Sequence, residues 1–344
     1  MRVLLTADTL GGVWTFAAEL SEQLARAGSD VVVAALGRAP NDDQRRACRR
    51  VDVIAYECAL EWMDDPWGDV EASGEWLLAL ANELEPDVVH VNNYAHASLP
   101  FRAPVVVGAH SCVLSWYEAV RGEGAPESWA RYRDEVERGL TAADAVVAPT
   151  AAMLRALHRH YAFTTESHVI PNGRRTPPAR AKRPLVISAG RAWDEAKNIA
   201  AVERVAPRLP WPVRIAGEGS ALGHVEQQVL EAWVGEASIF ALPARYEPFG
   251  LGALEAAGAG CALVLGGVAS LHEVWGDAAA YVDPDDDTAL ADTLLRLIED
   301  TPLRKRYARA AQTRALELTP ERMAAAYLAL YDRLTARVDR LERV

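Results

Sequence analysis

Two glutamates, Glu247 and Glu255, stand eight positions apart behind an apolar run, Ile239–Leu242. A helical pattern begins between them, near Gly250. The unpaired amides at the start of a helix attract an anion, and a glycine there permits close approach. Each carboxylate can accept bonds from two hydroxyls, so this spacing would allow the two acids to bind two different sugar rings. The simpler alternative is that Glu247 compensates the helix dipole and Glu255 is a surface acid.

Two cations, Arg191 and Lys197, follow another apolar run, Leu185–Ala189, and a second helical pattern begins just after them at Asn198. Ligands of open α/β sheets bind at the carboxyl ends of the strands. An arginine fork and a lysine point charge at such an end could converge on a diphosphate. A pair of solvated surface cations is the alternative.

Further candidates follow expected strands of the first half. Gly11 and Gly12 form a strand–glycine–glycine–helix turn that lets the backbone approach a phosphate, although any tight turn could use them. His110 ends the run Val105–Ala109, where a histidine either contacts a ligand or is structural. Softer candidates for an acceptor region are His90, Asn92, Asn93, Tyr94, His96, Trp116, Tyr117 and Glu118.

Short apolar runs alternate with amphipathic segments along the whole chain, which predicts an α/β fold with parallel sheets covered by helices. Expected strands of the first half are Arg2–Ala7, Val31–Leu36, Val51–Ala55, Asp87–Val91, Val105–Ala109, Ala145–Ala148 and His168–Ile170, with helices at Thr15–Ala27, Glu71–Leu84, Glu127–Ala142 and Ala151–His160. Expected strands of the second half are Leu185–Ala189, Val213–Ala216, Ser238–Leu242, Ala262–Leu265 and Ala279–Val282, with helices at Asn198–Leu209, Gly223–Val234, Gly250–Gly258, Asp287–Glu299 and Leu303–Leu316.

A Pro- and Arg-rich segment, 171–184, interrupts this alternation and predicts an interdomain linker. We therefore expect two Rossmann-like domains, residues 1–175 and 176–320, facing across a cleft. A last helical pattern runs from Pro320 to about Leu341. It is either a surface helix of the second domain or, as we expect for residues 321–344, a strut that packs back on the first.

Composition excludes other classes of protein. The 344 residues carry a formal net charge of -12, which argues against a nucleic-acid partner because phosphates require an excess of Lys and Arg. The four cysteines are scattered, which predicts reduced, mostly buried thiols. No stretch is long and apolar enough to span a membrane, and the first residues lack a signal-peptide pattern. We expect a cytoplasmic protein without stable membrane insertion.

These motifs together resemble the retaining GT-B glycosyltransferases of family four, also called glycosyl transferases group 1. The most specific feature is the E-x7-E spacing that begins in Tyr-Glu-Pro-Phe-Gly-Leu, 246–251. The Gly190-Arg191 to Lys197-Asn198 stretch, the Gly11-Gly12 turn, Pro171-Asn172-Gly173 and the segment around Glu273 support it. The resemblance covers essentially the whole chain.

The resemblance implies roles for individual residues. Glu255 would bind the ribose hydroxyls of the donor, Glu247 the hydroxyls of the transferred sugar, and His110 the donor sugar or phosphate. Arg191 and Lys197 would neutralise the leaving diphosphate, so that no metal is needed. The donor-binding set is Gly11, Gly12, Arg191, Lys197, Gly217, Glu247, Phe249, Gly250, Leu251 and Glu255, and the catalytic set is His110, Arg191, Lys197 and Glu247.

The implied reaction moves a sugar from a nucleoside diphosphate, UDP or GDP first, to an acceptor hydroxyl with retention at the anomeric carbon. The acceptor would be a sugar, a lipid-linked molecule or a small molecule. Family members usually carry an extra strand and helix between the positions of Gly219 and Ala237, where this chain has room for one helix. The base must then be recognised by fewer structural elements, for example by the backbone near Gly217. A GT-B epimerase, a phosphorylase and a non-catalytic sugar-nucleotide-binding protein are the alternatives.

Overall fold

The computed structural model describes residues 1–219, 222–223 and 225–341. Ser220, Ala221 and His224, which fall in the expected loop and helix after Gly217, and the last three residues of the expected C-terminal helix lie outside the described residues. The chain divides into two compact units, and each contains one parallel sheet. The first unit comprises Met1–Ser115, Gly124–Gly173 and Pro320–Val344, and the second comprises Trp116–Glu123 and Arg174–Thr319.

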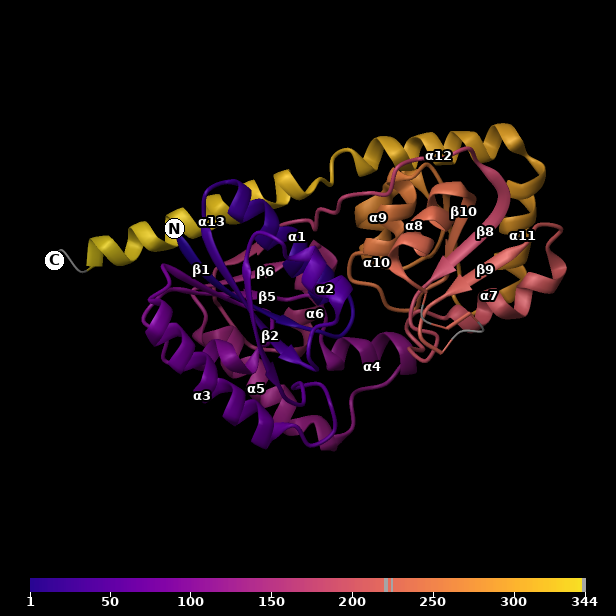
Figure 1. The fold of residues 1–344 in the computed structure, drawn as a ribbon. Coiled ribbons are helices and arrows are strands. Elements are labelled where there is room, and N and C mark those ends of the chain that lie inside the picture. Colours follow the sequence, from indigo (N-terminus) through magenta and orange to yellow (C-terminus); the bar gives the residue numbers. More distant parts are fainter. Residues whose placement is uncertain (220–221, 224, 342–344) are drawn as a thin grey trace. The chain divides into compact units, whose positions relative to one another are not determined.

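The sheet of the first unit has seven parallel strands in the order β3-β2-β1-β4-β5-β6-β7. Figure 1 labels β1, β2, β5 and β6 of this sheet. The strands are β1 (Arg2–Asp8), β2 (Asp30–Gly37), β3 (Asp52–Glu57), β4 (Val88–Val91), β5 (Val105–Gly108), β6 (Ala145–Ala148) and β7 (Ser167–Val169). Strands β4, β5 and β6 are buried along their whole length, as expected for continuous apolar runs covered on both faces.

Helices cover both faces of this sheet, and two separate clusters of buried apolar side chains form its two cores. The helices are α1 (Gly12–Arg26), α2 (Asp42–Ala47), α3 (Trp67–Leu84), α4 (Val113–Arg121), α5 (Ala130–Ala142) and α6 (Ala151–His160), with short 3-10 turns η1 (Ala95–Ser98) and η2 (Glu127–Trp129). The last helix, α13 (Pro320–Leu341), packs against α1 and places Tyr327, Tyr331 and Leu334 in the same core. The C-terminal helix thus packs on the first unit, as expected.

The sheet of the second unit has five parallel strands in the order β12-β11-β10-β8-β9. The strands are β8 (Arg183–Ala189), β9 (Val213–Ala216), β10 (Ala237–Leu242), β11 (Ala262–Gly266) and β12 (Ala280–Val282). The helices are α7 (Ile199–Val205), α8 (Gln227–Glu236), α9 (Leu251–Gly258), α10 (Ala269–Trp275), α11 (Asp287–Glu299) and α12 (Thr301–Ala315), with 3-10 turns η3 (Ala206–Arg208) and η4 (Gly276–Ala278). One continuous core, centred on β10 and β11, joins these elements.

The prediction of an α/β fold with parallel sheets is confirmed, and most strand positions agree within one or two residues. Of the described residues between β9 and β10, those of α8 are the only ones in a helix, and none is in a strand. That helix begins at Gln227, four residues later than expected. Gly223 has a φ of +63°, and Glu226 has the extended angles φ -54° and ψ 140°, so neither continues a helix.

The irregular segment Pro171–Lys182 contains no helix or strand. All four cysteines are free thiols; Cys48, Cys112 and Cys261 are buried and Cys58 is half-buried. Within the part of the chain that the structure describes, no helix combines the length and apolar character needed to cross a bilayer.

Among the titratable side chains of the first unit, three histidines and one glutamate have pKa values that are shifted because the groups are removed from water. Burial, together with the neighbouring His110, lowers the pKa of His90 to about 3. Burial likewise lowers the pKa values of His96 and His110 to about 4. It raises the pKa of Glu61 to about 7, although this carboxyl group accepts bonds from the amides of Tyr94 and Ala95. The histidines and Glu61 therefore couple stability to pH in opposite directions.

Acidification is expected to destabilise the first unit. Near pH ~5.5 the unfolded chain holds about three more protons on these histidines, while the folded protein holds about one more on Glu61. The free energy of unfolding should therefore fall by about 2 kcal/mol per pH unit as the pH drops from about 6.5 to 4.5. Urea unfolding at several pH values measures the slope, and hydrogen exchange of the β4 amides assigns it to this unit.

The variant Glu61→Gln tests the opposing contribution. It removes the only one of the four groups that favours the folded state at low pH. The slope of the unfolding free energy against pH should therefore increase by the contribution of about one proton. An unchanged slope in Glu61→Gln would contradict the raised pKa of Glu61.

Candidate functional site

The candidate donor site lies where β8 and β10, neighbours in the second sheet, end at the same edge. Two loops follow these strands and are bonded to each other. The amide of Arg245 donates to the carbonyl of Ala196 at 2.8 Å, and the side chain of Asn198 donates to the carbonyl of Pro243 at 3.0 Å. Asn198 has a left-handed backbone with φ 52°, which asparagine tolerates better than most residues. These bonds fix the loop that carries Arg191 and Lys197 against the loop that carries Glu247.

Lys197 and Glu247 form an ion pair at the centre of this site. The distance from Lys197 Nζ to Glu247 Oε2 is 2.7 Å, and the two side chains are only 20% and 13% exposed. The other carboxylate oxygen, Oε1, accepts the amide of Gly250 at 2.9 Å. Glu247 therefore binds the amide that lies just before α9, a position that also fits the simpler interpretation of an acid that compensates the helix dipole. The same carboxylate also touches a cation that could bind a phosphate.

Glu255 lies inside α9 and pairs with a residue that the sequence analysis placed only in the linker. Arg174 Nε is 2.6 Å from Glu255 Oε1, and the side chains are 18% and 15% exposed. Glu255 is therefore a largely buried, oriented carboxylate rather than a free surface acid. Gly250, at the start of α9, has a φ of +92°, a conformation that glycine adopts without strain. Phe249 is buried and Leu251 is half-buried.

Arg191 is held by an acid from its own loop. Arg191 NH2 is 2.8 Å from Asp194 Oδ2. Burial raises the pKa of Asp194, but the neighbouring Arg191 outweighs it, so the pKa of this carboxyl group is lowered overall and the pair stays ionised. Asp194 also accepts the indole N–H of Trp116 at 3.3 Å, a contact within the second unit. The Arg191 side chain is 34% exposed, so the guanidinium remains accessible to a ligand.

Gly217 follows β9 and touches the backbone of Gly190, which follows β8. A Cβ atom on Gly217 would stand 1.8 Å from the Gly190 carbonyl oxygen, and the backbone φ is +140°. The amide of Gly190 also donates to the carbonyl of Ala216 at 3.0 Å. Only glycine fits at position 217, so its first structural role is to let two loops of the candidate site meet.

Gly11, Gly12 and His110 lie in the first unit. Gly11 has a φ of 84° and precedes α1, and both glycines are exposed, so the first amides of α1 face solvent. His110 Nε2 lies 2.9 Å from Asn92 Oδ1, and its ring packs on Phe16 with 4.2 Å between the ring centroids. Asn92 is fixed in turn, because its side-chain nitrogen donates to the carbonyl of Thr6. An amide oxygen only accepts, so His110 carries its proton on Nε2 and is neutral at neutral pH.

Five of the softer candidates are buried: His90, Asn92, Asn93, Tyr94 and His96. His90 lies inside β4 and is completely buried, with Nδ1 2.6 Å from the hydroxyl of Tyr331 in α13. His96 is also buried, and its Nε2 lies 3.1 Å from the hydroxyl of Ser73 in α3. Their side chains hold helices to the sheet, because both turn into the packed layers beside it. Glu273 lies on the exposed side of α10.

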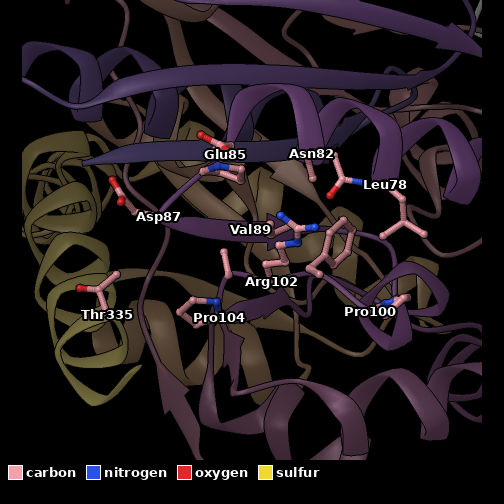
Figure 2. A pocket seen from close by; sticks show the side chains of 13 residues that line it. Leu78, Asn82, Glu85, Asp87, Val89, Pro100, Arg102, Pro104 and Thr335 are labelled. Carbon is pink, nitrogen blue, oxygen red and sulfur yellow. The ribbon is translucent and has the colours of Figure 1, made fainter. Parts of the chain in front are cut away.

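One pocket of the first unit lies away from these residues (Figure 2). It has a volume of about 250 Å³ and is lined by the end of α3, the residues that precede β4 and β5, and Thr335 of α13. The residues around it include Asn82, Asp87 and Arg102, which are labelled in Figure 2. This is the amino edge of the sheet, opposite the edge where open α/β sheets bind ligands. It contains none of the candidate site residues.

Two family models match the chain. One described as Glycosyltransferase Family 4 matches residues 10–176, and one described as Glycosyl transferases group 1 matches residues 219–314. The chain belongs to the group 1 glycosyltransferases with the GT-B fold.

Individual relatives agree with this assignment. The D-inositol 3-phosphate glycosyltransferase of Xylanimonas cellulosilytica is 28% identical over an alignment that covers 95% of this chain and 93% of that protein. The O-antigen chain mannosyltransferase B of Escherichia coli is 35% identical over 126 residues, which make up 37% of this chain but only 31% of that protein. The solved structure of HepE from Anabaena in complex with UDP and glucose has the same fold, with a TM-score of 0.76, 15% identity, and coverage of 97% of this chain and 100% of that one.

Proposed function

We propose that this glycosyltransferase moves a sugar from a nucleoside diphosphate to an acceptor hydroxyl, with retention at the anomeric carbon and without a metal ion. The observation that carries the proposal is the ion pair of Lys197 and Glu247 at the adjoining ends of β8 and β10. It places a cation that suits a phosphate next to a carboxylate that suits sugar hydroxyls. Arg191, from the same loop, supplies a second cation.

Donor binding would rearrange this ion pair. A phosphate oxygen that approaches Lys197 competes with Glu247 for the ammonium group, and Glu247 then accepts hydroxyls of the transferred sugar. Glu255, oriented by Arg174 at 2.6 Å, would bind the ribose hydroxyls. We assign the remaining donor contacts to the backbone at Gly217 and at Phe249–Leu251. The UDP and glucose in the HepE structure support UDP as the first donor nucleotide to test, with GDP second.

The first unit would supply the acceptor-binding surface. We assign Gly11 and Gly12 to a ligand contact through their exposed backbone, and His110 to a hydrogen bond with the donor sugar or phosphate. Because His110 is neutral at neutral pH, it contributes a hydrogen bond and no charge. Its Nε2 donates to Asn92, so the ligand contact falls to the unprotonated Nδ1, which can only accept. Of the two proposed partners, this nitrogen therefore suits a hydroxyl of the donor sugar and not a phosphate oxygen. A sugar, a lipid-linked molecule or a small molecule would be the acceptor.

The chemical step follows from the groups at the site. The bond between the anomeric carbon and the diphosphate oxygen breaks, and a bond from the acceptor oxygen to that carbon forms on the same face. The acceptor proton passes to the leaving diphosphate. Arg191 and Lys197 stabilise the negative charge that develops on that diphosphate, which is the role a magnesium ion has in other transferases.

Thermal unfolding with UDP, GDP, ADP, dTDP and their sugars, in EDTA, tests the donor site. A preferred nucleotide should raise the unfolding temperature, by mass action on the folded state. With that donor, NMR of the product should show the anomeric configuration of the donor sugar retained.

Each other outcome contradicts a stated part of the proposal. If none of the nucleotides stabilises the protein, the assignment of the donor site is contradicted. Conversion of the sugar nucleotide without an acceptor indicates an epimerase. A product of inverted configuration excludes retention. Activity that appears only after a divalent metal is added excludes metal independence.

A further inference from the structure

Trp193 stands out among the tryptophans. The chain has ten, all within the described residues, and Trp193 is the only one whose side chain is exposed, at 55%. Single exposed apolar side chains are common on proteins, so this fraction alone indicates nothing. Its position does suggest a function, because Trp193 lies in the four-residue stretch from Arg191 to Asp194 at the carboxyl edge of the second sheet.

The Trp193 ring is held in place on one side. The Arg191 guanidinium lies over the ring with its central carbon 4.9 Å from the ring centroid, and Asp194 fixes that guanidinium at 2.8 Å. The indole N–H donates to Glu218 Oε2 at 3.4 Å. A cation over one face leaves the opposite face for another ring. Because the ring is already oriented, a ligand that stacks there would order few additional groups.

The loops on either side of Trp193 form one frame. The amide of Ala192 donates to the carbonyl of Glu218 at 2.9 Å, which ties the loop after β8 to the loop after β9. A Cβ atom on Gly219 would stand 3.7 Å from Cδ1 of Trp193, so this loop lies alongside the indole. Trp193 therefore stands over the end of β9, the edge strand of the sheet.

The order of the strands indicates how a bound donor would lie along the edge of the sheet. Lys197 and Glu247 lie where β8 and β10 end, and β9 lies on the other side of β8. In a nucleoside diphosphate sugar the diphosphate joins the sugar at one end to the nucleoside at the other. With the sugar at Glu247 and the diphosphate at Lys197 and Arg191, a base that extends toward β9 would reach Trp193.

We propose that Trp193 stacks on the nucleobase of the donor and so provides the base contact in a sheet that ends at β9. This inference rests on the proposed function and names the residue that binds the base. Any base has a π face, so stacking would contribute to binding of every nucleotide. The preference among bases would then come from the polar groups at the rim, of which Glu218 is the nearest described one.

Binding of a nucleoside diphosphate and of pyrophosphate to the same variants tests the proposal. Calorimetry should show that Trp193→Ala weakens binding of the preferred nucleoside diphosphate by roughly 10- to 100-fold. Pyrophosphate has no base, so its affinity should stay within about twofold. Trp193→Phe keeps an aromatic face and should retain most of the nucleotide affinity.

Labelling with 5-fluorotryptophan gives an independent readout. The resonance that is missing in Trp193→Phe should shift when the nucleotide is added. Trp233 is a matched control, since Arg214 lies over its ring at 4.6 Å in the same unit. Its resonance should not move.

The outcomes separate the two proposals. Nucleotide affinity unchanged in Trp193→Ala would overturn the stacking contact while leaving the donor site intact. An equal loss of affinity for the nucleotide and for pyrophosphate in Trp193→Ala would also overturn it, because Trp193 would then act only through Arg191. A wild-type protein that binds neither ligand would contradict the proposed function itself.

Discussion

Replacing Lys197 by methionine is expected to lower the rate constant of sugar transfer by about 100- to 1000-fold, the usual effect of removing one group that stabilises developing charge. The side chain keeps its length but loses the ammonium group that pairs with Glu247 at 2.7 Å. The diphosphate would then leave with one cation fewer. Steady-state kinetics at saturating donor, well below the unfolding temperature, measure the effect.

The same change also leaves Glu247 unpaired at 13% exposure, which costs stability. Arg204→Met is the matched control, because Arg204 also pairs with an acid, Asp287, at 2.6 Å in the second unit. This pair is exposed and lies outside the candidate site, so activity should stay within about twofold, as for most exposed ion pairs. Transfer at a near wild-type rate by Lys197→Met would refute the assignment of the diphosphate to this lysine.

Gly217→Ala should destabilise the second unit by about 3 kcal/mol or more, because overpacking and backbone strain act together. The new Cβ atom would stand 1.8 Å from the carbonyl oxygen of Gly190, at a φ of +140°. Relief of this clash must move the loop from Gly190 to Asp194, so donor binding should be lost as well. Urea unfolding and nucleotide calorimetry measure the two effects.

Gly276→Ala separates strain from the clash. Gly276 has a φ of +48°, and a Cβ atom there meets no other atom within 4 Å. Its φ of 48° and ψ of -126° form a conformation that glycine adopts far more easily than other residues, so its replacement should cost about 1–3 kcal/mol from backbone strain alone and leave donor binding unchanged. If Gly217→Ala proves no more harmful than Gly276→Ala, the loops after β8 and β9 do not meet as described.

Regular elements were predictable because their signals are local. Continuous apolar runs such as Val105–Gly108 and Ala145–Ala148 form parallel strands almost residue for residue, since both faces of the sheet are covered. Short helices were missed: α2, α4 and α10 have six, nine and seven residues. Helices of fewer than three turns show too few repeats of the apolar pattern, and tertiary packing stabilises them.

For the candidate site, the motifs indicated which strand ends matter but not which side chains would pair. The E-x7-E spacing gave no sign that Glu247 would bind both Lys197 and the amide of Gly250. Arg174 was assigned only to a linker, because its partner Glu255 is 81 positions away and no local pattern connects them. His90 and His96 had the type and position of site residues, yet their side chains turn into the core. Which face a single polar side chain takes at the end of a short strand depends on distant elements.

The path of the chain through the first unit has a consequence for biosynthesis. Residues of α13 fill the core beside α1 with Tyr327, Tyr331 and Leu334, although they are translated after the whole of the second unit. The second unit, which comprises Trp116–Glu123 and Arg174–Thr319, is synthesised before them. Until α13 has been made, the face of the first sheet that α1 and α13 share is therefore only partly covered, although the second unit is already complete. Completion of the first unit thus waits for α13, and a nascent chain released before this helix is made would expose an apolar surface to chaperones.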